Sequence, residues 1–131
     1  MDRRPDERRI GHRKPVVGLH CTWDLAGVGV RRRFLRRHVP VQAEVTELSV
    51  SGATVIAPAS ELLVPGTAVA IEIEGERGGV AVRNVAPAAT DGMSRYGVEF
   101  LQLGPGIRSR INEFVGSDRP DNLETIWHNA R

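Results

Sequence analysis

The strongest constraint on the fold is an alternation of apolar and polar residues that recurs along the chain. Its clearest case is Val69, Ile71 and Ile73 on one side, with Glu72 and Glu74 on the other. Successive side chains of a strand point to opposite faces of a sheet, so this period of two favours a strand with one buried face. Similar stretches predict six strands, at residues 15–23, 39–48, 53–57, 67–74, 80–88 and 94–101.

Turn residues separate these predicted strands. Ser51-Gly52, Pro65-Gly66 and Asp91-Gly92 are typical turn dipeptides, and the glycine-rich residues 75–79 predict a hairpin loop. Trp23, at the end of the first predicted strand, is expected to be half-buried.

The period changes near the end of the chain. In residues 105–115, Ile107, Ile111, Phe114 and Val115 fall on one face of a helix. Six strands and one helix predict an all-β domain with a C-terminal helix. We expect a six-stranded antiparallel β-barrel, because closure removes exposed strand edges, and the helix can cover one end.

The 131 residues suit one domain of this kind. Residues 1–14 are polar, charged and unpatterned, and are expected to form a flexible N-terminal arm. Residues 15–116 are expected to form the barrel and its helix, and residues 117–131 a polar C-terminal tail.

Basic residues are almost all arginine. The 18 Lys and Arg residues balance 16 Asp and Glu residues to a net charge of +2, and Lys14 is the one lysine. The planar fork of arginine suits phosphates and guanine edges, so the excess indicates an anionic partner. A GC-rich coding sequence explains the same excess equally well.

The sequence gives no sign of an enzyme, a metal site or a membrane protein. Ser49 and Ser51 lack a G-x-S-x-G setting, the histidines lack metal-ligand spacing, and no phosphate-binding glycine loop is present. Cys21 is the single cysteine, which excludes an internal disulfide. No apolar run approaches the roughly 18 residues of a membrane helix, so we expect a cytoplasmic protein without membrane insertion, cofactor or metal.

Two short motifs carry the functional prediction. The first is Glu47-x-Ser49-x-x-Gly52, which places a carboxylate, a hydroxyl and backbone N–H groups at the turn between two strands. The second is Arg9-x-x-x-Arg13 in the N-terminal arm. One strand hairpin separates them, so they can meet at one edge of the barrel.

In this order and separation the two motifs resemble those of the PilZ family of cyclic di-GMP receptors. The family pattern is R-x-x-x-R on an arm and [D/N]-x-S-x-x-G at a strand turn. The ending Arg95-Tyr96-Gly97-Val98-Glu99-Phe100, with the helix after it, is similar to the last strand and helix of such domains. The resemblance covers roughly residues 8–115.

The resemblance implies a receptor for cyclic di-GMP that orders its arm on binding and signals to a downstream protein, here unidentified. Arg9 and Arg13 would bind phosphate and guanine, Ser49 would donate to phosphate, and Gly52 would let the backbone approach the ligand. Arg8 directly precedes the arginine pair. In some relatives an arginine at that position accompanies binding of a stacked ligand dimer. Glu47 departs from the family's Asp or Asn by one methylene, a misfit that would cost about 1–3 kcal/mol if uncorrected.

Three alternatives remain open from the sequence. Arg32 with Arg36, or Arg33 with Arg37, is a second placement of the arginine pair, although too few residues then precede Ser49 for a hairpin. The second alternative is a PilZ-like protein-interaction module that has lost its ligand. A small-barrel nucleic-acid binder that uses residues 31–37 is less favoured, because aromatic residues for base stacking are scarce there.

Overall fold

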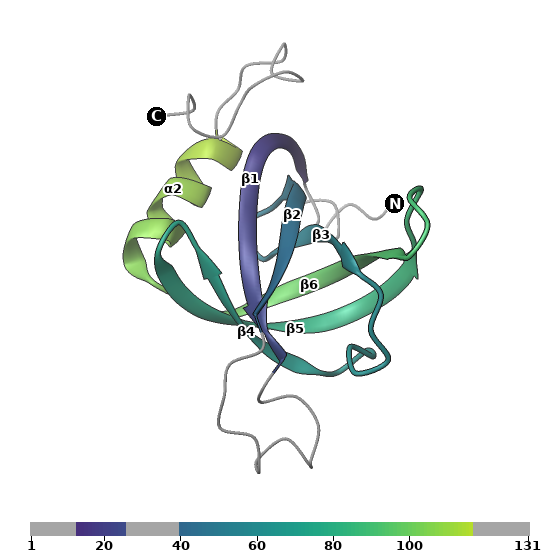
Figure 1. The fold of residues 1–131 in the computed structure, drawn as a ribbon. Helices are drawn as coiled ribbons and strands as arrows, with labels where there is room; N and C mark the ends of the chain where they lie inside the picture. Colours follow the sequence, from purple (N-terminus) through teal and green to yellow (C-terminus); the bar gives the residue numbers. More distant parts are fainter. Residues whose placement is uncertain (1–12, 26–39, 117–131) are drawn as a thin grey trace, which may run out of the picture.

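The structure is a computed structural model that describes residues 13–25 and 40–116. They form a closed, antiparallel six-stranded barrel followed by one helix (Figure 1). The order of strands around the barrel is β1-β2-β3-β6-β5-β4, and β4 pairs with β1 to close it. The elements are β1 (Lys14–Asp24), β2 (Pro40–Leu48), β3 (Gly52–Pro58), β4 (Ala68–Ile73), β5 (Glu76–Pro87), β6 (Met93–Leu103) and α2 (Pro105–Gly116).

The predicted fold class is confirmed, and one expected loop is wrong. The hairpin between β4 and β5 turns at Glu74 and Gly75, whose φ angles are 52° and 85°. Two consecutive positive φ angles make a tight two-residue turn, so β5 begins directly afterwards at Glu76. Gly78 is therefore a strand residue. Glycine is needed there because β6 is close: a Cβ would be 2.4 Å from the Gln102 carbonyl oxygen.

The barrel interior is filled by the apolar side of each strand. Trp23 is fully buried, so the expectation of a half-buried residue is wrong. Its indole packs edge-to-face on Tyr96 with ring centroids 5.2 Å apart, a favoured aromatic geometry. The Tyr96 hydroxyl donates to the Pro58 carbonyl at 3.3 Å and accepts from the Ser60 N–H at 3.2 Å.

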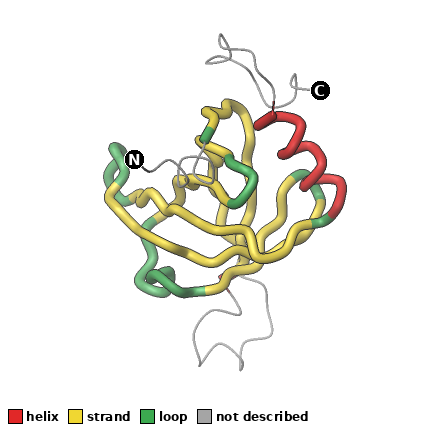
Figure 2. Tube along the Cα trace, turned by 180° about the vertical axis from the view of Figure 1, so that it is seen from behind, coloured by secondary structure: helices red, strands yellow, loops and turns green. Residues whose placement is uncertain are grey.

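Helix α2 packs on the barrel beside β1 and the β4–β5 hairpin, as the view from behind also shows (Figure 2). Its apolar face joins the barrel core through three buried residues, Ile107, Ile111 and Phe114. The fourth predicted member of this face, Val115, is partly buried. The predicted helical face is therefore correct.

Charged side chains from the barrel hold both ends of α2. Glu76 Oε1 accepts from the Ile107 N–H at 3.1 Å, which places a carboxylate at the positive helix N-terminus. At the other end, the Lys14 ammonium is buried, donates to the Phe114 carbonyl at 2.9 Å and lies 4.9 Å from the centre of the Phe114 ring. Residue 14, at the start of the barrel, thus contacts the last turn of the helix.

Candidate functional site

The strand register places a row of residues across the outer face of the barrel. Glu47 of β2 is opposite Thr54 of β3, Thr54 is opposite Gly97 of β6, and Gly97 is opposite Asn84 of β5. Two β-bulges create this row, since the register shifts between Val45 and Glu47 and again between Val82 and Asn84. Bulges redirect side chains and are common beside functional sites.

A chain of two hydrogen bonds connects the two sequence motifs. Arg13 Nη1 donates to Thr54 Oγ1 at 2.8 Å, across 41 positions of sequence, and the same hydroxyl donates to Glu47 Oε1 at 3.0 Å. The threonine hydroxyl thus accepts from the cation and donates to the carboxylate. It holds Arg13 next to Glu47, on the outer face of the barrel rather than at an edge.

These residues line a surface pocket of about 290 Å³. Its walls carry two guanidinium groups, one carboxylate, two hydroxyls and one amide. The lining residues are Arg13, Thr46, Glu47, Thr54, Asn84, Arg95 and Gly97. Such a set of convergent donors and acceptors suits a polar, anionic ligand better than an apolar one.

Ser49 lies in the turn between β2 and β3 and is buried. Its Oγ accepts from the Gly52 N–H at 3.0 Å and lies 3.2 Å from the Gly52 carbonyl oxygen, to which it donates. The Ser49 N–H also donates to the Gly52 carbonyl at 2.8 Å. Ser49 therefore holds the turn closed, and it is not among the pocket-lining residues.

Gly52 has a reason of its own to be glycine. A Cβ at this position would lie 2.1 Å from the Val98 carbonyl oxygen on β6, which is far inside contact distance. The close approach of β3 and β6 thus requires glycine here. The roles of Ser49 and Gly52 in ligand binding stay predictions.

Several predicted residues lie outside the described residues. These are Arg8 and Arg9 of the arm, the arginine pairs between residues 31 and 37, and the tail at residues 117–131. Of the six predicted site residues, the structure places Arg13 and Glu47 in one pocket, with Ser49 in the adjacent turn and Gly52 at the start of β3.

Thr54, Asn84 and Arg95 were not predicted from the sequence to belong to the site. They come from three strands, β3, β5 and β6, that meet only in the folded barrel. The one local signal is Gly97 within an otherwise alternating strand. A Cβ there would lie 2.6 Å from the Asn84 side-chain oxygen, so the missing side chain makes room for the Asn84 amide.

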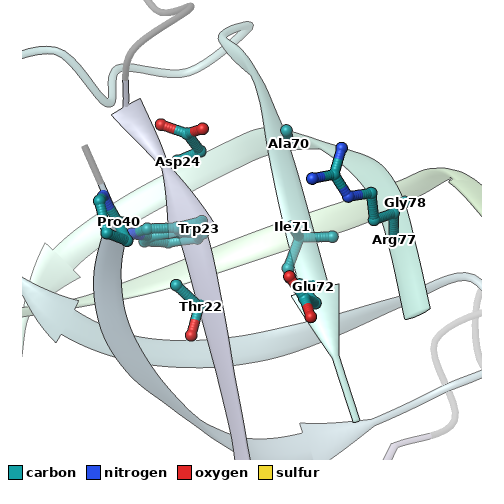
Figure 3. Close-up of a pocket in the computed structure, with 9 residues that line it drawn as sticks. All are labelled: Thr22, Trp23, Asp24, Pro40, Ala70, Ile71, Glu72, Arg77 and Gly78. Carbon is teal, nitrogen blue, oxygen red and sulfur yellow. The ribbon is translucent and has the colours of Figure 1, made fainter. Parts of the chain in front are cut away.

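A second, larger pocket of about 390 Å³ lies over the seam where β1 pairs with β4. Trp23 and Pro40 line one side, and Ala70, Ile71 and Glu72 line the other (Figure 3). The indole Nε1 of Trp23 is buried and has no hydrogen-bond partner within the described part of the chain.

Cys21 lies two residues before Trp23 in the buried face of β1. Burial raises the pKa of its thiol from 9.0 to about 12, because the uncharged form is favoured away from water. The thiol is therefore protonated at neutral pH and is a poor nucleophile or metal ligand.

Residues 13–25 and 40–116 contain no group of three or more His, Cys, Asp or Glu side chains placed to hold a metal ion. They also contain no helix that is long and apolar enough to cross a membrane.

No protein-family model matches the sequence, and a search of curated proteins gives no match. Among solved structures, the fold is similar to the PilZ domain with c-di-GMP of YcgR from Escherichia coli. The TM-score is 0.53 and the sequences are 13% identical, over 76% of this chain and 82% of that chain. The chain therefore has a PilZ-like fold.

Proposed function

We propose that this protein is a non-enzymatic receptor that binds cyclic di-GMP in the pocket lined by Arg13 and Glu47. The observation that carries the proposal is the pair of hydrogen bonds through Thr54, which joins one residue from each predicted motif. The PilZ-like fold supports it, since the solved structure of the similar YcgR domain is a PilZ domain with c-di-GMP.

The chemistry of the pocket matches this ligand. Cyclic di-GMP offers two phosphates, which the guanidinium of Arg13 can bind through charge-assisted hydrogen bonds. Its guanines present N1–H and N2–H donors, for which the Glu47 carboxylate is an acceptor. Arg9 and Arg8, from the arm, add further cations, and we expect Arg8 to accompany two stacked nucleotides.

A hydrogen bond from the neighbouring strand holds the longer side chain of Glu47. Its Oε1 accepts from Thr54, a residue of the neighbouring strand, so the extra methylene does not leave the carboxylate without a fixed position. A carboxylate held in one orientation loses less side-chain entropy on binding. We therefore expect a working site with glutamate at this position.

Signal transmission would follow from ordering of the arm. Arg13 contacts the pocket, and the next residue, Lys14, is fixed to the end of α2 through the Phe114 carbonyl. The arm thus leaves the barrel from an anchored base. Ligand charge would draw the arm onto the barrel and create or cover a surface for an unidentified downstream protein.

Calorimetric titration of cyclic di-GMP tests the proposal. The wild type is compared with an Arg9→Ala, Arg13→Ala double variant and with Arg77→Ala, whose arginine lines the other pocket. We expect saturable binding that the double variant loses and Arg77→Ala retains. A stoichiometry near two would support the role given to Arg8, and a stoichiometry of one would contradict it.

Absence of binding by the folded wild type would overturn the receptor proposal. The protein-interaction module would then be favoured, since that function does not need the nucleotide. Binding that persists unchanged in the double variant would place the nucleotide elsewhere on the molecule.

A further inference from the structure

Arg95 lies on β6, two residues before Gly97, and therefore on the same outward face of that strand. It is exposed and lines the pocket together with Arg13 and Glu47. Its Cα partners are Ile56 on β3 and Ala86 on β5, neither of which carries a polar side chain. The guanidinium is thus presented to the pocket by a strand that is paired on both sides.

Two other described arginines, one on β5 and one on α2, have carboxylate partners. Arg83 forms an ion pair with Glu99, in which its Nε lies 2.7 Å from the carboxylate oxygen, and Arg110 pairs with Glu74. Within the described part of the chain, the Arg95 side chain makes no hydrogen bond or ion pair. Its charge is therefore available to a ligand.

The charge balance of the pocket depends on Arg95. Among the described lining residues, Glu47 offsets the charge of Arg13, to which Thr54 links it. Arg95 alone gives these side chains a net positive charge. An anion in the pocket thus gains its net attraction to the barrel from this residue.

We infer that Arg95 is a ligand-binding residue of the pocket and that its guanidinium binds a phosphate of the bound nucleotide. This inference rests on the proposed function, since the phosphate belongs to cyclic di-GMP. It adds a binding residue from β6 that neither sequence motif contains. The site would then have a cation on the barrel in addition to those on the N-terminal segment.

The test is calorimetric titration of cyclic di-GMP into the full chain and three variants. Arg95→Gln removes the charge and is expected to weaken binding about 10- to 100-fold, as for loss of a charged hydrogen bond. Arg95→Lys keeps a point charge, which serves a phosphate, and should retain most of the affinity. The matched control is Arg83→Gln, on the adjacent strand but outside the pocket lining.

The outcomes separate this inference from the proposed function. If the wild type does not bind, both fail. If the wild type binds and Arg95→Gln binds equally well, the inference alone is overturned. If Arg95→Lys loses as much affinity as Arg95→Gln, the residue needs its planar fork, as for a guanine edge, and the phosphate assignment is wrong. Thermal unfolding of each variant shows that the fold is retained.

Discussion

The pocket that contains Glu47 and the pocket over the β1–β4 seam differ in the chemistry of their walls more than in their size. The larger, about 390 Å³, includes the buried side chains of Trp23 and Ile71. The smaller, about 290 Å³, is lined by polar and charged residues and one glycine, brought together by two bulges. We place the ligand in the smaller pocket because recognition of a polar anion depends on convergent donors and acceptors, and volume alone does not supply them.

The seam between β1 and β4 explains the larger pocket. These strands pair over only four residues of each, from Cys21 opposite Ile73 to Asp24 opposite Ala70. The pocket over that short seam has the core itself as its floor. We therefore interpret Trp23 as a residue that supports the fold, although its indole N–H has no partner among the described residues.

The largest expected effect comes from Trp23→Ala. Removing a fully buried tryptophan from the core is expected to lower the free energy of unfolding by about 3–5 kcal/mol. Chemical denaturation followed by circular dichroism measures the loss. Trp23→Phe is the control, since it keeps a ring against Tyr96 and removes the unpaired N–H. A loss below about 1 kcal/mol for Trp23→Ala would contradict a structural role.

The next effect contrasts one carboxylate from each pocket. Glu47→Gln keeps an oxygen for Thr54 but removes the charge, so cyclic di-GMP binding should weaken by about 1.5–3 kcal/mol. Glu72→Gln in the larger pocket should leave the affinity unchanged. Calorimetry measures both. Equal losses from the two variants would break the distinction between the pockets.

The strands were predictable from the sequence because their signal is local. Val69, Ile71 and Ile73 alternate with polar residues, and the structure buries all three. The predicted loop between β4 and β5 is too long because Glu74 takes a positive φ, which is not expected for a glutamate. Gly78 suggests a loop from the sequence, whereas the structure needs glycine there because the backbone of β6 leaves no room for a Cβ.

The candidate site was predictable only where a motif carries it. Arg13 and Glu47 were found through the order and spacing of two short patterns. Asn84 and Arg95 reach the pocket through the pairing of β6 with β3 and β5, and the bulge before Asn84 shifts that register by one residue. A one-residue shift reverses which side chains face outward, and no pattern within a single strand reveals it.

A third prediction concerns Cys21, in the buried face of β1. The Cys21 thiol has a pKa of about 12 when folded and 9.0 as its ordinary value, so between these values only the unfolded chain loses this proton. Stability should therefore fall as pH rises above 9, by up to about 1.4 kcal/mol per pH unit from this group. The contribution of the thiol is the difference between wild type and Cys21→Ala in free energy of unfolding, measured by chemical denaturation at pH 8 to 10.5. Parallel curves for the two proteins would show that the thiol ionises equally easily in both states.

The smallest expected effect on stability is at Gly97, in the floor of the smaller pocket. In Gly97→Ala the new methyl group would meet the Asn84 amide, whose atoms lie 2.6–3.0 Å from it. Asn84 is exposed, so its side chain can change rotamer at a cost of roughly 0.5–1.5 kcal/mol. Part of that cost is offset because alanine loses less backbone entropy than glycine in a strand, by about 0.5–1 kcal/mol. The free energy of unfolding should change by less than about 1 kcal/mol.

Binding should respond more strongly than stability to this change, because the methyl group and the displaced amide occupy the floor on which the ligand would lie. Adding Asn84→Ala to Gly97→Ala relieves the contact, so the double variant should recover the lost stability without recovering the affinity for cyclic di-GMP. Gly52→Ala provides the contrast: its Cβ meets the backbone oxygen of Val98, which no rotamer can move. If Gly97→Ala destabilises the barrel as much as Gly52→Ala, the glycine serves strand packing, and the floor of the smaller pocket is no more specialised than the seam beneath the larger one.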